Sequence, residues 1–226
     1  MRSMYRYSKR QFSKLLLEKG NIRIGTLHDF RRSEHKRGIS DPQEGKKEVS
    51  HRVRDLHIDD LGNVLSGTSK DADALKAFGL VRRGPGAGTT IVRGAIGIHT
   101  FDQADCFVLC TSKTLSREIM LEFEGADSCV RIVDIANFYN RLTVLLQRVV
   151  PVTFRGIHEI RYQDRREAWN GRDWGFHPAL IKEVQFKKQS EIRAIWAPAG
   201  NRQIEPVIVE DPWLRTCCVE VEPECL

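Results

Sequence analysis

Short runs of alternating or continuous apolar residues recur along the chain and predict strands rather than long helices. Asn21 to Leu27, for example, places Ile22 and Ile24 at alternate positions between polar residues. This alternation is typical of a strand that buries one face. The same kind of pattern predicts strands at residues 5–7, 21–27, 106–110, 130–133, 154–162, 192–196, 207–209 and 217–221.

Helical signals are concentrated in the first half and the middle of the chain. Ser8 is the predicted N-cap of a first helix, with Gln11 as its capping-box partner and Gly20 as its end. Asp134 is the predicted N-cap of a long helix that runs to Arg148. Further helices are predicted at residues 71–78 and, after a turn, within residues 112–123.

The segments between these elements are polar and rich in turn signals. Residues 28–50 contain Asp41-Pro42 and Glu44-Gly45, and residues 163–178 form a polar loop. Gly84 to Gly88 mark a loop in the least ordered-looking stretch, residues 60–90. No strand precedes this loop and no Lys-Ser/Thr pair follows it, so it does not match a phosphate-binding loop.

The mixture of strands and helices predicts a fold class and a domain organisation. We expect a single α+β domain over residues 1–226, with a strand-rich core, helices on one side and a variable insert around residues 60–90. Hydrophobic residues make up 41% of the chain and charged residues 29%, which predicts a packed globule rather than disorder.

The net charge of +6 and the pI of about 9.1 have two possible interpretations. Either the excess of cations attracts a polyanion or an anionic cofactor, or the protein simply has a basic surface. No apolar run follows the basic N-terminus and none approaches the roughly 18 residues that span a bilayer, so neither a signal peptide nor membrane attachment is expected. The six cysteines show no Cys-x-x-Cys spacing, which predicts reduced thiols, a cytoplasmic location and no metal site.

Two short segments carry candidate binding groups. Arg6 lies between Tyr5 and Tyr7, where a guanidinium between aromatic rings is suited to an anion; the alternative is an edge strand with a solvated Arg6. Thr111 and Ser112 end an apolar strand, where hydroxyls donate to a ligand or, more commonly, cap the following helix.

Gln189 and Glu191 are the candidate catalytic residues. They stand two positions apart at the head of a run that reads as a strand, so both side chains are expected on one face, near Arg193. A carboxylate beside cations stabilises developing positive charge or accepts a hydrogen bond from a hydroxyl. The alternative is a surface strand with paired charges.

Other polar groups leave alternatives open. Asp29 and Arg31 contact a ligand or stabilise a turn through local ion pairs. Asp41 and Glu44 are expected to be solvated turn residues rather than a metal pair. Aromatic residues in the 163–178 loop stack on a base or anchor the loop to the core; they are Trp169, Trp174 and Phe176.

An Arg on the first strand, a hydroxyl-rich strand end and a late Gln-x-Glu resemble the R-S-E pattern of ADP-ribosyltransferases. The matching positions are Arg6, then Cys110-Thr111-Ser112 in place of the usual Ser-Thr-Ser, then Gln189-Ser190-Glu191. The chain also resembles a family of uncharacterised bacterial domains, some of them linked to abortive phage infection. That resemblance lies in residues 5–7, 25–31, 107–112, 120–130 and 186–195.

The resemblance implies an ADP-ribosyltransferase-like core and NAD as the cofactor. Glu191 would hold the ribose and stabilise an oxocarbenium-like centre, and Gln189 would orient the acceptor. Arg6 and Tyr7 would bind the cofactor, with Thr111 or Ser112 supporting Glu191 and the nicotinamide ribose. The acceptor would be nucleic acid or protein, and the protein a toxin or phage-defence effector with a neutralising antitoxin as partner.

A different class of function remains open beside this one. The alternative is a non-catalytic nucleic-acid-binding or regulatory domain of the same fold. A nuclease is a weaker third alternative, because no cluster of carboxylates suited to a metal is visible in the sequence.

Overall fold

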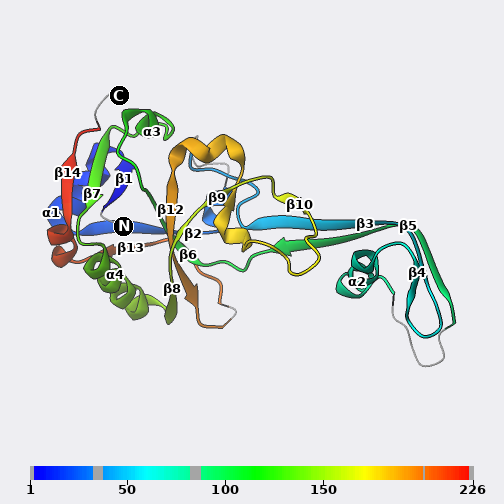
Figure 1. Ribbon diagram of the computed structural model, residues 1–226. Helices are drawn as coiled ribbons and strands as arrows, with labels where there is room; N and C mark the ends of the chain where they lie inside the picture. The colour runs from blue at the N-terminus through cyan, green and yellow to red at the C-terminus, as the bar shows by residue number, and fades with distance from the viewer. Residues whose placement is uncertain (1–2, 33–37, 82–87, 201, 224–226) are drawn as a thin grey trace. The chain divides into compact units, whose positions relative to one another are not determined.

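The computed structural model describes residues 3–32, 38–81, 88–200 and 202–223 (Figure 1). The chain forms two compact units. Unit 1 consists of Met1–Gly45, Gln103–Gln163 and Ala179–Leu226, and unit 2 of Lys46–Asp102 and Asp164–Pro178. The chain is strand-rich with mainly antiparallel sheets, which confirms the predicted α+β class. A single domain over residues 1–226 with an insert around 60–90 stays a prediction.

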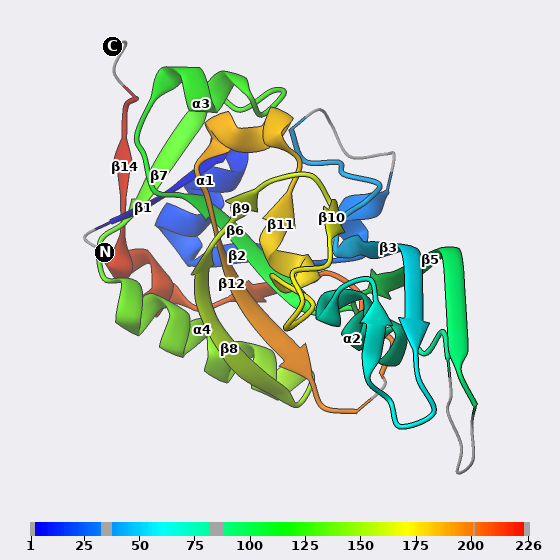
Figure 2. The ribbon, with the colours of Figure 1, turned by 45° about the vertical axis from the view of Figure 1, so that its right-hand side comes forward.

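Unit 1 is built on an eight-stranded sheet in which every neighbouring pair is antiparallel. The strands of this sheet are β1 (Met4–Ser8), β2 (Asn21–Thr26), β6 (Phe107–Ser112), β7 (Ser128–Ile132), β8 (Val152–Glu159), β12 (Glu191–Pro198), β13 (Val207–Glu210) and β14 (Cys218–Val221). One edge of β6 pairs with β12, and the other edge pairs with both β2 and β1 (Figure 2).

The sheet opens where β1 and β2 diverge along their shared edge of β6. β2 pairs with β6 through Phe107 and Val108, whereas β1 pairs with it through Ser112. Leu109, Cys110 and Thr111 therefore lie between the two pairings. This gap in the sheet is the feature of the fold that positions the candidate site.

The helices of unit 1 are α1 (Arg10–Lys19), α3 (Arg117–Leu121) and α4 (Ile135–Val149). The predicted Asp134 cap is confirmed, because its carboxylate accepts from the Asn137 backbone N–H at 3.2 Å. Gly20 ends α1 as predicted, at φ 68, a left-handed conformation that favours glycine. The predicted Ser8 cap is wrong: Lys9 is the N-cap, and the Ser8 hydroxyl bonds that of Ser13 at 2.9 Å.

Short elements complete unit 1. A two-stranded parallel sheet pairs β9 (Arg161–Tyr162) with β11 (Ile181–Lys182). The 3-10 helices are η1 (Asp29–Arg31), η2 (Pro178–Leu180), of which Pro178 belongs to unit 2, η3 (Val184–Gln189) and η4 (Pro212–Cys217). No helix in the described part of the chain is long and apolar enough to cross a membrane.

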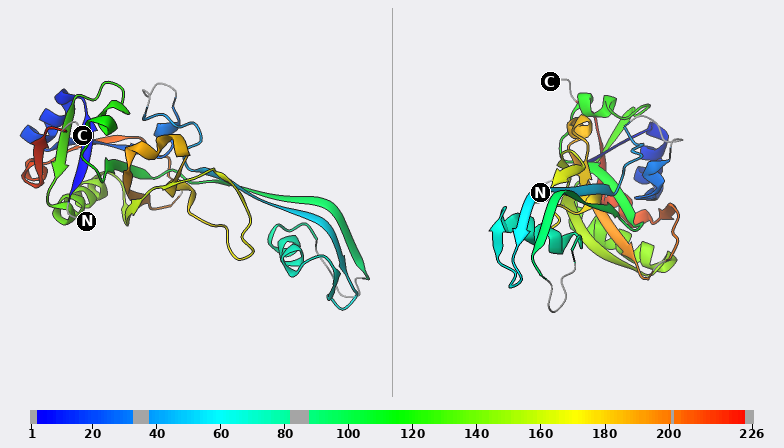
Figure 3. Two further views of the ribbon diagram at one scale, coloured as in Figure 1. Left: turned by 45° about the horizontal axis from the view of Figure 1, so that its top comes forward. Right: turned by 90° about the vertical axis from the view of Figure 1, so that its right-hand side faces the viewer.

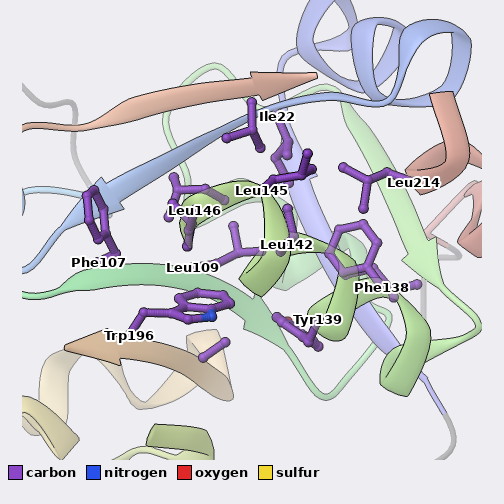
Figure 4. Packing of buried hydrophobic residues seen from close by; sticks show 14 of the residues in the cluster. Ile22, Phe107, Leu109, Phe138, Tyr139, Leu142, Leu145, Leu146, Trp196 and Leu214 are labelled. Atoms are coloured by element: carbon purple, nitrogen blue, oxygen red, sulfur yellow. The ribbon is translucent and has the colours of Figure 1, made fainter. Parts of the chain in front are cut away.

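The main core of unit 1 lies between the sheet and the helices α1 and α4 (Figure 4). Phe138, Tyr139 and Leu142 on α4 are fully buried in the same cluster as Trp196 of β12, and the ring centroids of Tyr139 and Trp196 lie 6.1 Å apart. The Trp196 indole donates to the Thr143 hydroxyl at 2.8 Å, so its one polar atom is satisfied. Alternate residues of β6 and β12 face this core, which fixes where their remaining side chains point.

Unit 2 contains β3 (Lys46–Ile58), β4 (Val64–Ser66), α2 (Ser69–Ala77), β5 (Thr90–Asp102) and β10 (Arg166–Ala168). β3 and β5 run antiparallel side by side along their length (Figure 3). The predicted helix at 71–78 is confirmed as α2, with a capping box between Thr68 and Asp71. Residues 82–87, with most of the Gly84 to Gly88 loop, lie outside the described residues.

Residues 46–50, for which the polar pattern predicted no element, begin β3. Val49 and Val53 point into unit 2 at alternate positions, but Leu56 and Ile58 follow in the opposite phase. The change of phase occurs opposite Gly94, which has a φ of 65. Because the alternation is broken and the partner strand β5 is distant in sequence, the sequence pattern alone does not predict β3.

The aromatic residues of the 163–178 loop mostly pack inside unit 2. Trp169 is 4% exposed and packs with Val49 and Ala74. Its ring meets that of Phe78 edge to face, with centroids 5.8 Å apart. Trp169 and the partly buried Trp174 thus anchor the loop to the core of unit 2, in agreement with the anchoring alternative.

We predict that Leu142→Ala destabilises the protein by about 2–5 kcal/mol, because a fully buried side chain leaves a cavity. Val144→Ala on the same helix is the matched control, since Val144 is 42% exposed and should change stability by only about 0.5 kcal/mol. Denaturant titration measures both free energies of unfolding. Equal effects would contradict the assigned face of α4.

Candidate functional site

A cavity of about 430 Å³ occupies the gap in the unit 1 sheet. Its walls come from β1, β2 and β6, from α1, and from the segments around Ile39 and Phe123. All predicted site residues except Gln189 line it: Arg6, Tyr7, Thr111, Ser112 and Glu191. Residues from the N-terminal, middle and late parts of the chain thus line one cavity.

These residues reach the cavity from two faces of the sheet. Ser112 is the register partner of both Tyr5 on β1 and Glu191 on β12, so the three form a row on one face. Arg6 and Thr111 occupy the alternate positions of their strands, which point to the opposite face. The cavity borders both sets because it lies in the gap between β1 and β2.

Arg6 is a cation of this cavity that has no counter-charge among the described residues. Among the described residues, no hydrogen bond or ion pair joins its guanidinium to another group, although the side chain is partly buried. Burial lowers the pKa of Arg6 from its ordinary value, and the nearby thiol of Cys110 opposes this. A guanidinium in this setting is a donor for an anionic ligand.

Glu191 belongs to a buried charge cluster, which we define as Glu44, Lys182, Gln189, Glu191 and Arg193. Its Oε1 accepts from Arg193 Nε at 2.5 Å, and its Oε2 accepts from Lys182 Nζ at 2.6 Å. Arg193 also forms a two-pronged pair with Glu44, with both N–O distances 2.8 Å. Two carboxylates and two cations therefore compensate each other away from water.

The cluster fixes the ionisation of its members. Burial alone would raise the pKa of Glu191, but Arg193 and Lys182 outweigh it and lower the pKa to about 2. Burial alone would lower the pKa of Arg193, and Glu191 and Glu44 raise it well above its usual range instead. Glu191 is consequently a carboxylate at every pH at which the protein is expected to work.

Gln189 reaches Glu191 by a different route from the one predicted. The expectation of an extended Gln189-Ser190-Glu191 segment is wrong, because Gln189 ends η3 and Ser190 adopts a left-handed φ of 46. Gln189 instead accepts from Lys182 Nζ and donates to the Gly38 carbonyl, both at 2.8 Å. It holds the loop at Gly38 against the charge cluster and does not line the cavity.

The hydroxyls at the end of β6 make local contacts. Ser112 Oγ donates to the Thr114 carbonyl and accepts from the Thr114 N–H, both at 3.2 Å, as a turn-forming serine does. The Thr111 hydroxyl lies 3.5 Å from the Ile192 carbonyl. Neither bonds the Glu191 carboxylate, and neither caps the following helix, because the N-cap of α3 is Ser116.

Tyr7 forms an aromatic wall of the cavity with Phe123. The two rings are stacked, with centroids 6.0 Å apart and an interplanar angle of 18°. The Tyr7 hydroxyl donates to the Thr114 carbonyl and accepts from the Ser116 N–H, both at 2.8 Å. Tyr7 thereby tethers the segment before α3 to β1, and burial raises its pKa to about 12.

No local sequence pattern indicates that Glu44 and Asp41 are buried. The prediction that both are solvated turn residues is wrong: they are 1% and 3% exposed. Asp29 and Arg31 make contacts within the protein, in agreement with the alternative to ligand binding. Asp29 accepts a hydrogen bond from Arg23 at 2.7 Å, and Arg31 donates one to the Glu44 carbonyl at 2.7 Å. Within the described residues, no group of His, Cys, Asp and Glu side chains is arranged to hold a metal.

No protein-family model, curated protein or solved structure matches the chain. The geometry of the cavity and the resemblance in its residues are therefore the only indications of function.

We predict that Glu44→Gln destabilises the protein by about 3–5 kcal/mol, because it removes one charge from the buried pair with Arg193. Glu159→Gln is the matched control. Glu159 makes an ion pair of similar length with Lys113, 2.9 Å, but both side chains are about half exposed, and surface pairs contribute at most about 1 kcal/mol. Denaturant titration compares the two, and similar losses would contradict the importance of burial.

We also predict an acid-dependent loss of stability that Glu191→Gln abolishes. The pKa of Glu191 is lowered from 4.5 to about 2, so its contribution is complete above 4.5 and is lost as pH falls toward 2. A shift of that size corresponds to about 3 kcal/mol. Free energies of unfolding across this range should converge for wild type and variant. A constant difference between them would contradict the prediction.

Proposed function

We propose that the cavity of unit 1 binds an anionic dinucleotide of the NAD type and that the protein transfers ADP-ribose from it to nucleic acid or protein. The observation that carries the proposal is the Arg6 guanidinium. It has no counter-charge among the described residues, and it borders the same cavity as Tyr7 and the ionised Glu191. The two cations of the charge cluster, Lys182 and Arg193, are already paired with carboxylates.

The residues present fit such a ligand. The volume of about 430 Å³ lies within the range of roughly 300–1,000 Å³ typical of small-molecule sites. Tyr7 and Phe123 offer an aromatic surface to a base, and Arg6 offers a planar fork of donors to a phosphate. Three adjacent strands, β1, β6 and β12, carry the Arg, hydroxyl and Glu positions in the order of the R-S-E pattern, which supports an ADP-ribosyltransferase-like core.

The chain's own groups have separate tasks in this proposal. NAD supplies a labile bond between ribose and nicotinamide; its electron pair leaves with nicotinamide, while an acceptor nucleophile bonds the ribose carbon and loses its proton. Glu191 places a fixed negative charge beside the cavity, which stabilises positive charge developing on the ribose. Arg6 orients the phosphates, and Arg193 and Lys182 hold the Glu191 carboxylate in place.

A second candidate function is a non-catalytic binding domain. The observation that favours it is the full engagement of Glu191, because each carboxylate oxygen already accepts a hydrogen bond from a buried cation. Such a carboxylate is partly neutralised before any ligand arrives. In this case the cavity would bind a nucleotide to regulate contact with nucleic acid, without turnover.

We predict that NAD raises the thermal midpoint of the wild-type protein and that Arg6→Ala weakens NAD binding by at least about tenfold, or about 1.4 kcal/mol. Arg10→Ala is the matched control, since Arg10 is exposed at the neighbouring helix start and does not line the cavity. Thermal midpoints across an NAD titration give the affinities. A wild-type protein indifferent to NAD, or equal losses in both variants, would reject the binding site.

Turnover distinguishes the two candidate functions. Labelled NAD is offered with RNA, DNA and protein separately, and release of nicotinamide and transfer of label are followed. The transferase predicts turnover that Glu191→Gln removes while NAD still stabilises the variant. Gln is preferred to Ala here because Ala leaves Lys182 and Arg193 without a partner in a buried site. Stabilisation by NAD without turnover in the wild type would favour the non-catalytic domain.

A toxin or phage-defence role and a neutralising antitoxin partner stay predictions from the resemblance. They depend on the same turnover: a protein that consumes NAD or modifies nucleic acid in its host needs an inhibitor, whereas a non-catalytic domain does not.

A further inference from the structure

One wall of the cavity comes from a segment outside the strands. We define the Gly38 wall as Gly38, which is buried, and Ile39, which is 37% exposed; both residues line the cavity. Beyond this wall the segment is fixed, because the Asp41 N–H donates to the Phe30 carbonyl at 2.8 Å. The contacts of Gly38 therefore decide how far the wall lies from the rest of the cavity.

The Gln189 side chain holds the Gly38 wall. It is 1% exposed; its Nε2 donates to the Gly38 carbonyl and its Oε1 accepts from Lys182 Nζ, both at 2.8 Å. A carbonyl can only accept and an ammonium can only donate, so one orientation of the amide satisfies both. Since Lys182 also donates to Glu191 at 2.6 Å, the position of the Gly38 carbonyl is tied to the buried charge cluster.

Gly38 also contacts a second wall of the cavity through its backbone. At its φ of 86, a Cβ added to Gly38 would overlap the Glu122 carbonyl oxygen and would lie 3.2 Å from the Phe123 Cα. The position therefore requires glycine, and the two backbones lie against each other. Phe123 lines the cavity and stacks on Tyr7. A shift of the Gly38 wall consequently changes the support of this aromatic wall.

We propose that Gln189 is a positioning residue whose hydrogen bond to Gly38 sets the place of the Gly38 wall and thereby the fit of the cavity to its ligand. Gln189 does not line the cavity, so it acts through Gly38 and does not touch the ligand. This role differs from the acceptor-orienting role that the resemblance implies. The effect on the wall is independent of the ligand's identity, whereas the effect on NAD rests on the proposed function.

The first test is cleavage of the full-length protein by thermolysin, which cuts before large aliphatic residues. Gln189→Met keeps the length of the side chain and removes the donor, so the bond before Ile39 should be cut at least about tenfold faster. Gln185→Met, on the exposed face of the same 3-10 helix, is the matched control and should be cut at the wild-type rate. Mass spectrometry identifies the fragments. A Gln189→Met protein cut like its control, or only in proportion to its globally unfolded fraction, overturns the proposal.

The second test displaces the same wall from its other side. Gly38→Ala should also speed cleavage before Ile39, because its methyl group overlaps the Glu122 carbonyl. Gly200→Ala is the matched control: Gly200 has a similar φ of 70 but nothing within 4 Å of an added Cβ, so it carries the backbone strain without the overlap. Because both changes release one wall, the double variant with Gln189→Met should be cut no faster than the faster single variant. Effects that multiply would overturn the coupling of Gln189 to Gly38.

NAD then tests the consequence for the ligand. In the wild type NAD should slow cleavage before Ile39, and Gln189→Met should weaken NAD binding at least about tenfold, since the wall is no longer held in place before the ligand arrives. An unchanged affinity in Gln189→Met, with Gln185→Met as the control, overturns the effect on the cavity. A wild type whose thermal midpoint does not respond to NAD counts against the proposed function alone, because the cleavage rates without ligand still decide whether Gln189 positions the wall.

Discussion

The paired guanidinium of Arg193 is the interaction on which the rest of unit 1 depends. It joins Glu44, in the loop before β3, to Glu191 at the start of β12, and Lys182 and Gln189 extend the contact to β11, η3 and Gly38. Segments far apart in sequence meet at these charges. Buried charges are tolerated only with such complete pairing, so any displacement of one segment exposes an uncompensated ion.

That constraint divides the cations of the site into two classes. Arg193 and Lys182 are neutralised by carboxylates and serve to hold a wall of the cavity. Arg6 lies across the gap in the sheet and has no such carboxylate among the described residues. A folded protein tolerates an unpaired, partly buried cation when water or a ligand satisfies it, and this asymmetry is the basis on which we propose an anionic ligand.

Local signals in the sequence predicted much of unit 1. Alternation located β2, a short apolar run located β12, Gly20 marked the end of α1, and Asp134 marked the start of α4. Only the resemblance predicted that Arg6 and Glu191 lie at the same cavity. The failures lie where distant partners decide the structure: Glu44 is buried by Arg193 on a late strand, and Gln189 ends a 3-10 helix. No local pattern encodes such contacts.

In the proposed function, Arg6 binds a phosphate of the ligand in place of a protein carboxylate. Calorimetric titration of the wild-type protein with NAD and with nicotinamide riboside, which lacks the phosphates, tests that assignment most directly. We expect NAD to bind at least about tenfold more tightly than the riboside, with the difference decreasing as salt is added. Equal affinities, independent of salt, would contradict a cavity that recognises its ligand through phosphate.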